Sequence, residues 1–388
     1  MSLTLAYNAR YLMVRKASTA LTVGGMALVV AVFTATFMLS NGLHETLAKG
    51  GSDQNVVVIQ RGSQNEIQSG ISREQAGVIL ADEAIQREAA NQPLATRDVV
   101  VLVSLKKRAD DGPSNVTMRG TQASASRIRE KVRLVSGRLP APGTREALVG
   151  QAIFRKFKGT DPGQSIRLLG MEWLITGIFE ADGSGYESEI WADADLLMST
   201  TKRNQYSSLT FRVTPGADFA ALKTRLENDR RLVLQVKTEK QFYADQSHAL
   251  SLFINFVGSF VSIIFSIGAI LGAMITMYSS VANRTQEIGT LRALGFTRKT
   301  VFAAFLKESL LLGFCGGLLG LVLASLLSFS KVSTTNFDTF AEVAFNFSLS
   351  PGIAAQSIVF ALLMGIVGGA LPAFRAARLK IVDALRAD

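Results

Sequence analysis

Four apolar runs without a charged residue stand out in this 388-residue chain. They cover residues 17–40, 249–283, 309–330 and 348–374. A helix needs about 20 apolar residues to cross a hydrocarbon core about 30 Å thick, so each run is long enough. Backbone groups in lipid must form hydrogen bonds within their own segment, and we therefore expect four membrane-spanning helices.

Two of the runs differ from a simple span. The second has 35 residues, more than lipid requires, so part of it should project into water as a stalk. The first is longer than the apolar core of about 7–15 residues in a signal peptide, and the Asn-Gly-Leu-His at 41–44 is a poor cleavage site. We expect it to be retained as an anchor. The fourth span is placed at 351–374, after a short loop at 331–350.

The distribution of Lys and Arg orients these spans. Twelve of these residues lie in the segments 1–16, 284–308 and 375–388, whereas the loop between the last two spans contains only Lys331. The positive-inside rule therefore places both termini and the segment 284–308 in the cytoplasm, and residues 41–248 outside it. The twelve are Arg10, Arg15, Lys16, Arg284, Arg292, Arg298, Lys299, Lys307, Arg375, Arg378, Lys380 and Arg386.

The composition of the chain mainly excludes certain partners and types of site. Charged residues make up 19% of the chain, below the roughly 25% of soluble domains. The net charge of +10 is compatible with nucleic-acid binding, but residues 41–248 hold 28 basic and 25 acidic residues. The excess charge therefore belongs to the cytoplasmic segments, and no nucleic-acid partner is expected. The single Cys315 excludes a disulfide framework and a Cys-x-x-Cys site.

Residues 41–248 have the mixed pattern of an α+β domain. A helix is expected at 72–90, where Ser72 and Gln75 are placed for a capping box, and another at 218–228. We predict two α+β subdomains, with the one at about 134–206 inserted into the other. The expected strands are 55–60, 98–105, 115–119, 165–169, 173–179, 208–213 and 232–236.

This insert carries no recognisable catalytic or ligand-binding motif. A nucleophile elbow, a metal-binding histidine cluster, a P-loop and a dinucleotide fingerprint are all missing from its sequence, so we predict no enzyme activity and no bound cofactor or metal. The acidic segment 182–187 is predicted to be a turn, with contact to a partner as the alternative. A metal site at His44 and His248 is disfavoured, and Trp173 and Trp191 are expected in the core.

The segment between the second and third spans has the most informative pattern. Ile288, Leu291 and Leu294 recur every three residues, which predicts a short amphipathic helix over 284–294. Gly295 fits its end in the left-handed conformation. Such a helix suits a groove in a soluble partner. A helix lying on lipid headgroups is the alternative interpretation.

Small residues at helical spacing predict close contacts between the spans. The third run contains two overlapping Gly-x-x-x-Gly repeats and the fourth contains one, a spacing that lets helix backbones approach in lipid. Packing within one chain is the favoured use, and a seam between two copies is the alternative. The glycines are Gly313, Gly316, Gly317, Gly320, Gly365 and Gly369.

The run Arg-Thr-x-Glu-Ile-Gly-x-x-Arg-Ala-Leu-Gly at 284–295 resembles the signature of the FtsX-like and MacB-like ABC-transporter permeases. Four spans around a large insert agree with this resemblance over the full length. The segment 380–382, Lys-Ile-Val, lacks the proline often found there. Segments similar to other patterns of the family lie at 8–10, 136–138, 146–150, 371–378 and 382–386.

The resemblance implies the fold and the partners of a type VII ABC-transporter permease. The protein would be a homodimeric, multi-pass subunit of a bacterial inner membrane, with a periplasmic insert made of a porter-like part (about 51–133 and 207–240) and an inserted Sabre-like part. Since the chain has no Walker A motif, ATP and magnesium would be bound by a separate ATPase subunit. A periplasmic adaptor and an outer-membrane channel are further implied partners.

We expect this permease to work by mechanotransmission, in which the ATPase moves the coupling helix and the spans relay the movement to the insert. Glu287 and Arg292 are predicted to make polar contacts with the ATPase, with Ile288 and Leu291 filling the apolar floor of its groove. The uncharged spans argue against a polar conduit, although Ser262, Ser266 and Thr276 offer hydroxyls for a smaller path. The full coupling set is Arg284, Glu287, Ile288, Gly289, Leu291, Arg292, Leu294 and Gly295.

Three other functions share parts of this pattern. An FtsX-like scaffold that activates an extracytoplasmic partner would have the same fold, and so would a LolC-like or LolE-like permease that extracts lipoproteins. A membrane-anchored enzyme is disfavoured because no catalytic constellation is present. The large insert favours export or extrusion of a substrate through an adaptor.

Overall fold

The computed structural model describes residues 16–88, 91–335, 340–381 and 384. Its contacts divide the chain into a helical unit (Met1–Asn41, Leu252–Ser330 and Phe347–Asp388) and an α+β unit (Gly42–Ser251 and Lys331–Asn346). The predicted residues 8–10, Arg10 and Arg15, and all of 382–386 except Ala384, lie outside the described residues. The side chains of His248 and Lys331 do so as well.

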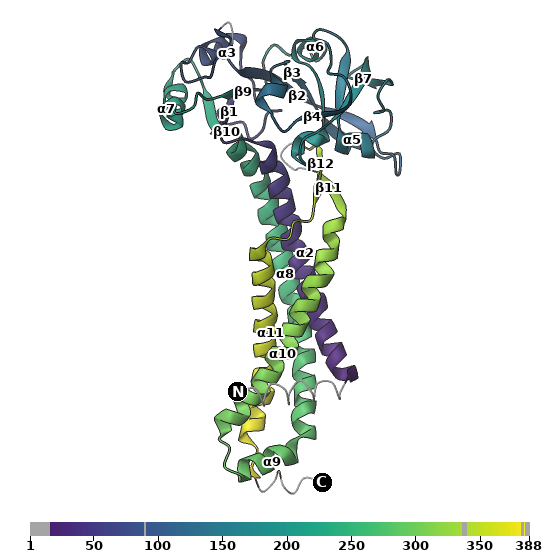
Figure 1. The fold of residues 1–388 in the computed structure, drawn as a ribbon, viewed down its shortest axis with the longest axis vertical. Coiled ribbons are helices and arrows are strands. Elements are labelled where there is room, and N and C mark those ends of the chain that lie inside the picture. Colours follow the sequence, from purple (N-terminus) through teal and green to yellow (C-terminus); the bar gives the residue numbers. More distant parts are fainter. Residues whose placement is uncertain (1–15, 89–90, 336–339, 382–383, 385–388) are drawn as a thin grey trace. The chain divides into compact units, whose positions relative to one another are not determined.

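Four helices are long and apolar enough to cross a membrane, and each corresponds to one of the four predicted spans (Figure 1), although the third predicted span extends to residue 330, beyond the end of its helix. Each is longer than its uncharged run because a helix does not end where apolarity ends. The third begins at Arg298, where the Thr297 side chain accepts a hydrogen bond from the backbone N–H of Thr300. The helices are α2 (Lys16–Gly50), α8 (Glu239–Asn283), α10 (Arg298–Ser325) and α11 (Pro351–Arg378).

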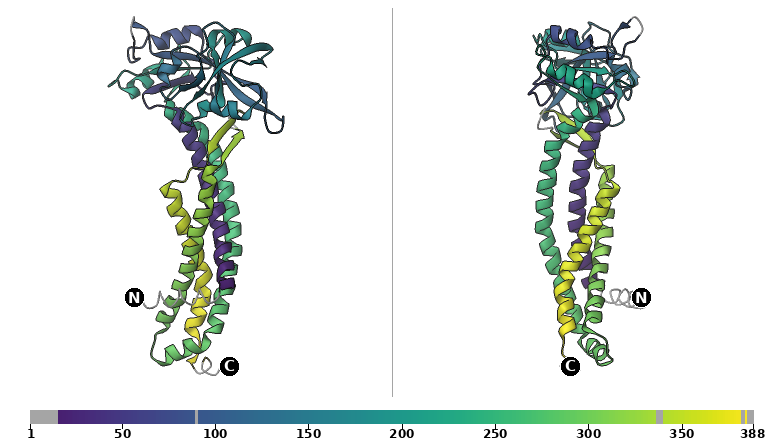
Figure 2. Two further views of the ribbon diagram at one scale, coloured as in Figure 1. Left: turned by 45° about the vertical axis from the view of Figure 1, so that its right-hand side comes forward. Right: turned by 90° about the vertical axis from the view of Figure 1, so that its left-hand side faces the viewer.

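The glycines of α10 and α11 allow these two helices to touch backbone to backbone, and they lie side by side in Figures 1 and 2. A Cβ at Gly313 would lie 2.7 Å from the carbonyl oxygen of Ala361, and one at Gly365 would lie 2.8 Å from that of Ser309. A Cβ at Gly369 would collide with the Ser309 side chain. The glycines here pack one chain against itself, as the favoured interpretation predicts.

The other glycines of the predicted set serve the same purpose. A Cβ at Gly317 would lie 2.8 Å from the Cβ of Ala361, again between α10 and α11. Gly316 and Gly320 face α2, where a Cβ would lie 2.7 Å from the Cβ of Met26 and 2.6 Å from the carbonyl oxygen of Ala27, respectively. The six predicted glycines therefore join three of the spans.

Hydroxyl groups in the helical unit bond to neighbouring helices or to their own backbone. Thr276 lies 2.7 Å from the hydroxyl of Thr22 on α2, and Ser266 donates to the carbonyl of Ile263. The buried hydroxyl of Ser262 has no hydrogen-bond partner in the structure. Of the three hydroxyls predicted for a polar path, that of Thr276 thus joins two helices and that of Ser266 bonds the backbone of its own helix.

The α+β unit contains a ten-stranded sheet in the order β10-β1-β9-β2-β3-β8-β5-β7-β4, with β6 beside β7 (Figure 1). The β3–β8 and β5–β7 pairs are parallel, and the other pairs are antiparallel. The strands are β1 (Asn55–Gln60), β2 (Ala95–Lys106), β3 (Pro113–Thr121), β4 (Arg133–Gly137), β5 (Glu146–Gly150), β6 (Ser165–Leu168), β7 (Met171–Glu180), β8 (Glu189–Asp193), β9 (Ser208–Arg212) and β10 (Leu234–Thr238).

The helices of this unit are short. The capping box of Ser72 and Gln75 is present, but its helix ends at Leu80 instead of residue 90, because Ile85 forms a bridge with Val213 and is buried there. The helix predicted at 218–228 begins one residue later, with Asp218 as its N-cap. The helices are α3 (Arg73–Leu80), α4 (Ala125–Ile128), α5 (Gln151–Lys156), α6 (Ala194–Thr200), α7 (Phe219–Asn228) and the 3-10 turn η2 (Gly185–Ser188).

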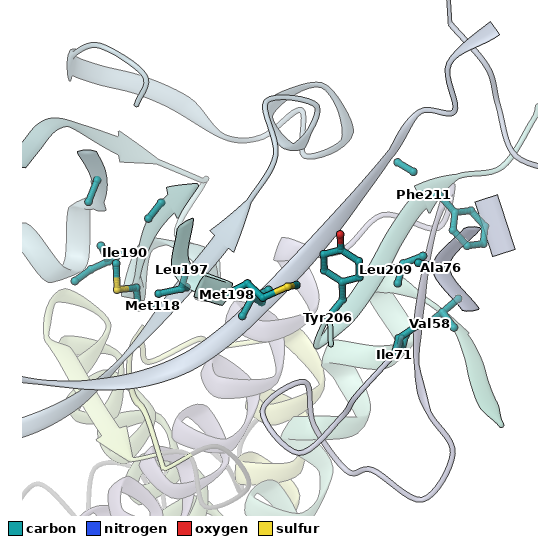
Figure 3. Packing of buried hydrophobic residues seen from close by; sticks show 14 of the residues in the cluster. Val58, Ile71, Ala76, Met118, Ile190, Leu197, Met198, Tyr206, Leu209 and Phe211 are labelled. Atoms are coloured by element: carbon teal, nitrogen blue, oxygen red, sulfur yellow. The ribbon is translucent and has the colours of Figure 1, made fainter. Parts of the chain in front are cut away.

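The predicted subdomains correspond to two halves of this one sheet. The segment predicted to be inserted, about 134–206, supplies β5 to β8 and nearly all of β4, whereas β1, β2, β3, β9 and β10 come from the segments on either side of it. However, β3 and β8 pair in parallel along five residues between these halves, and one cluster of buried side chains extends across both. Figure 3 shows Tyr206 between the group around Met198 and the group around Leu209. The halves therefore share one core.

The predicted loop 331–350 contains a β-hairpin. Its strands are β11 (Lys331–Thr335) and β12 (Glu342–Asn346), paired antiparallel, and both belong to the α+β unit. The 3-10 turn η3 (Leu326–Phe329) precedes it, after α10. This hairpin was missed because both strands are short and β11 contains only one apolar residue, Val332.

Replacing Gly365 by Leu should lower the thermal stability of the full chain in detergent, because the new Cβ would meet the backbone of α10. Overpacking of this kind costs about 1–3 kcal/mol. The measurement is the temperature at which half of the protein leaves its size-exclusion peak. Gly24→Leu on α2 is the matched control, because nothing lies within 4 Å of a Cβ there. Equal melting of the two variants would contradict the proposed contact.

Candidate functional site

The predicted coupling helix forms as α9 (Thr285–Ala293), which lies crosswise to α8 and α10 (Figure 1). Gly295 follows it with φ of +98°, in the left-handed region. The backbone N–H of Phe296 donates to the carbonyl of Leu291 at 3.1 Å, and that of Gly295 donates to the carbonyl of Arg292 at 3.1 Å. These two bonds form a Schellman motif, so the predicted role of Gly295 is confirmed.

The inner face of α9 is part of the chain's own core. Ile288 is 2% exposed and packs in a cluster with Val301, Phe305 and Ala373, and Gly289 is buried beside it. Three residues turn a helix through about 300°, so the row of Ile288, Leu291 and Leu294 winds around the helix by about 60° a step. Ile288 therefore faces inward, which corrects its assignment to the groove of a partner.

The outer face of α9 and the turn after it expose apolar side chains. Leu291 is 42% exposed, Leu294 is 74% exposed and Phe296 is 50% exposed. We call these three residues the outer patch. The half-exposed Glu287 and the exposed Arg298 flank the outer patch along the chain. Exposed apolar groups flanked by charges are typical of a protein-binding surface.

Arg284 fixes the start of α9 to α10. Its Nη1 lies 3.0 Å from Oε2 of Glu308, its Nε lies 3.0 Å from Oε2 of Glu287, and its guanidinium lies 5.2 Å from the ring centre of Phe305. Glu308 is 2% exposed and also accepts a hydrogen bond from Ser280. Arg284 was predicted to contact an ATPase, but its own buried position makes it an internal support.

Arg292 fixes the end of α9 in a similar way. Its Nη1 donates to the backbone carbonyl of Leu379 at 2.7 Å and approaches that of Ala377 at 3.4 Å, at the carboxyl end of α11. A cation there also interacts favourably with the helix dipole. Of the predicted coupling set, Glu287, Leu291 and Leu294 thus face outward, whereas Arg284, Ile288, Gly289 and Arg292 support the helix from within.

Glu308 was missed in the sequence because it lies just outside the third uncharged run. It is the only acidic residue between positions 288 and 337, directly before the third uncharged run. Such an isolated carboxylate at the end of a span calls for a basic partner. That signal points to a partner in the preceding basic segment, although not to Arg284 in particular.

The α+β unit contains a second set of buried charges, centred on Arg119 of β3, which is 1% exposed. Its guanidinium forms two bonds with Glu66 (2.7 and 2.8 Å), two with Glu189 (both 2.8 Å) and one with Asp98 (3.1 Å). Arg129, also buried, bonds Asp98 as well. Arg119 therefore links β2, β3, β8 and the loop before α3.

The same network reaches the first turn of α8. Arg129 donates to the hydroxyl of Tyr186 at 3.0 Å, and that hydroxyl lies 2.7 Å from Oε1 of Glu239, the first residue of α8. Asn55 at the start of β1 donates to the other oxygen of Glu239 at 2.8 Å. We call these groups, with Arg119, Glu66, Asp98 and Glu189, the sheet network. It ties the start of the second long helix to the sheet.

Electrostatic interactions and burial within the sheet network keep the Asp98 carboxyl group ionised and the Tyr186 hydroxyl protonated. Burial alone would raise the pKa of Asp98, but the guanidinium groups of Arg129 and Arg119 outweigh burial and leave this pKa below its ordinary value. Burial raises the pKa of the Tyr186 hydroxyl well above its ordinary value. The hydroxyl therefore stays protonated and can donate to Glu239.

The remaining predictions concern possible ligands of the α+β unit. Among the described residues, no group of three or more His, Cys, Asp or Glu side chains could hold a metal ion. His44 lies 2.8 Å from the hydroxyl of Ser247. Trp173 and Trp191 are buried, as predicted. The acidic turn is closed by the Glu187 carboxylate, which accepts from backbone N–H groups at 2.9 and 2.7 Å.

Family comparisons cover both parts of the chain. The MacB-like periplasmic core domain matches residues 19–229, and the FtsX-like permease C-terminal region matches residues 259–381. Similar proteins include the uncharacterized ABC transporter permease YknZ of Bacillus subtilis, which is 25% identical over 307 residues, 73% of this chain and 73% of that protein.

Other similar proteins are longer than this chain. The macrolide export ATP-binding/permease protein MacB of Nitrobacter winogradskyi is 26% identical over 255 residues, which are 61% of this chain and 38% of that protein. The pyoverdine export ATP-binding/permease protein PvdT of Pseudomonas syringae pv. tomato is 29% identical over 267 residues, with 62% and 38% covered. The chain thus matches little more than a third of these relatives' own length.

Solved structures show more distant similarity. The extracellular domain of YknZ has a TM-score of 0.36 and 12% identity, and the match covers 47% of this chain and all of that one. The periplasmic region of MacB from Actinobacillus actinomycetemcomitans has a TM-score of 0.38 and 11% identity, with 50% and 92% covered.

Replacing Asp98 by Asn should destabilise the α+β unit by about 3–5 kcal/mol at neutral pH, because Arg129 and Arg119 lose a buried counter-charge. The pKa of Asp98 is lower in the folded chain than the unfolded value of about 3.9. Its contribution to stability is thus present above that value and is lost as the pH falls through the folded pKa.

Urea unfolding of the full chain in detergent, followed by tryptophan fluorescence, measures this effect, because both tryptophans lie in the α+β unit. The difference between the wild type and Asp98→Asn should narrow below about pH 4. A difference that does not depend on pH would contradict the charge-based explanation.

Replacing Glu308 by Ala should loosen α9, because the buried guanidinium of Arg284 loses its buried partner. Breaking such a pair costs about 3–5 kcal/mol, so hydrogen exchange of the amides at 285–293 should accelerate at least about 100-fold. Glu287→Ala is the matched control, because this carboxylate is half exposed and such pairs contribute about 0–1 kcal/mol. Equal acceleration by both variants would refute the dominant role of Glu308.

Proposed function

Because the chain belongs to the ABC-transporter permease family that has a MacB-like periplasmic core domain and an FtsX-like C-terminal region, we propose that it couples ATP hydrolysis to movement of its α+β unit. The ATPase lies outside these 388 residues and binds the ATP and magnesium. The observation that carries this proposal is the outer patch, held outward on a helix that is fixed at both ends.

The contacts of α9 support transmission of force. A helix tied to α10 through Arg284 and to the end of α11 through Arg292 cannot turn independently of them. An ATPase that pushes on the outer patch therefore displaces these helices as well. The direct glycine contacts between α10 and α11 leave no space to absorb the displacement.

A second copy of the chain completes the proposed complex. The helix α8 is the least buried of the four candidate spans, and Gly268 and Gly272 on it have nothing within 4 Å of a Cβ. A Gly-x-x-x-Gly spacing of this kind favours close approach of another helix. We place the homodimer seam at this part of α8.

The remaining features of the proposed complex come from the family. The two halves of the sheet correspond to the porter-like and Sabre-like parts of a periplasmic domain, and the four candidate helices span a bacterial inner membrane with both termini in the cytoplasm. The names of the MacB and PvdT relatives support export of a substrate. A periplasmic adaptor and an outer-membrane channel would receive that substrate.

Replacing Leu291 and Leu294 together by Glu should reduce the amount of ATPase that co-purifies with the tagged full chain from native membranes at least tenfold, because two carboxylates would be buried in an apolar contact. Gln286→Glu on the same helix is the control, since it lies about 140° around the helix from Leu291. Quantitative mass spectrometry of the eluate measures the ATPase. Undiminished recovery would remove the outer patch from the proposed contact.

A further inference from the structure

The β11–β12 hairpin is held on the sheet by one buried carboxylate. Glu342 of β12 is 6% exposed and forms ion pairs with Lys107, after β2, and with Lys156 of α5. It also accepts hydrogen bonds from Ser114 of β3 and Ser333 of β11. A single side chain of the hairpin thus contacts two elements of the α+β unit and the segment that follows a third.

Apolar contacts and a hydrogen bond from the hairpin backbone complete this attachment. Ala341, Val343 and Phe345 are 2%, 7% and 4% exposed, and the backbone N–H of Ala344 donates to the hydroxyl of Ser188 at 3.2 Å. Separating a buried carboxylate from its lysines would leave charges without counter-charges, which is strongly unfavourable. We therefore expect the hairpin to stay attached to the sheet when the protein changes conformation.

The same hairpin is joined to α10 and α11 by very little chain. Between α10 and β11 lie only η3 and Ser330, and between β12 and α11 lie four residues, 347–350. The second link is itself held, because the Ser348 backbone N–H donates to the carbonyl of Met38, and the Ser348 carbonyl accepts from Asn41. Because both links are short, a displacement of the end of α10 or of the start of α11 is passed on to the hairpin.

We propose that this hairpin is a permanent strap that carries movement of α10 and α11 into the sheet at β3, with Glu342 as its positioning residue. The inference rests on the proposed function, and it adds a route to the one through the long helices α2 and α8. In this route, force on the outer patch passes through Arg284 and Glu308 to α10, and from α10 through the strap to the sheet.

The test compares Glu342→Gln with the matched control Glu146→Gln, which breaks another ion pair of the α+β unit, with Arg138. Both are made in the full chain with Cys315→Ala, and each is reconstituted with its ATPase. Hydrogen exchange is measured with and without a non-hydrolysable ATP analogue. Glu342→Gln should accelerate exchange of the described hairpin amides at least tenfold, retain ATPase binding and abolish the nucleotide-dependent exchange difference in β3. The control should retain that difference.

An engineered disulfide then distinguishes loss of transmission through the strap from general damage to the fold by the substitution. Ser188→Cys and Ala344→Cys, added to Glu342→Gln, join the two residues that are linked in the wild type by the hydrogen bond from the Ala344 backbone N–H to the Ser188 hydroxyl. The oxidised protein should regain the nucleotide-dependent difference in β3 and should lose it again on reduction. The strap would be overturned if the hairpin amides of Glu342→Gln exchange faster while the nucleotide-dependent difference in β3 is unchanged. It would also be overturned if oxidation of the disulfide variant does not restore that difference. A wild-type chain that binds no ATPase would overturn the proposed function, and the strap with it.

Discussion

A charged side chain that is buried needs a counter-charge nearby, and in this chain that constraint determines how the elements are joined. Arg284 and Glu308 join α9 to α10. Arg119 joins strands of the sheet through three carboxylates, and Glu342 joins the hairpin to it. The pairs of Arg284 and Arg119 are costly to break because the remaining partner would be left buried and charged. The joints are therefore stiff and specific in geometry, as the proposed transmission of force requires.

Stiffness within the helical unit has a different origin. Apolar burial does not distinguish a neighbouring helix from lipid, so the helices associate through close packing and interhelical hydrogen bonds. Glycines bring α10 against α11 and α2, and Thr34 donates to Ser357 between α2 and α11 at 2.8 Å. Helices in such contact move together, because a packed interface has no free volume in which to deform.

Family membership and side-chain geometry contribute different parts of the functional argument. The family matches identify a permease and cover both the α+β unit and the helices that follow it. They say nothing of which residues of α9 face outward. That division comes from burial: the motif's Ile288 and Arg284 are internal, while Leu291 and Leu294 are exposed. A motif thus contains both exposed residues and the internal supports that hold them outward.

Much of the architecture follows from local pattern alone. Uncharged runs long enough for lipid determine the four candidate spans, helical spacing and Gly295 determine α9, and β1 occurs at the predicted residues 55–60. These features depend on residues close together in the chain. The joints do not: Arg284 pairs with Glu308 24 positions later, and Ser114 bonds Glu342 228 positions later. Only the folded chain determines which of many possible partners a charged residue meets, because burial and distance, and not sequence separation, set the energy of a pair.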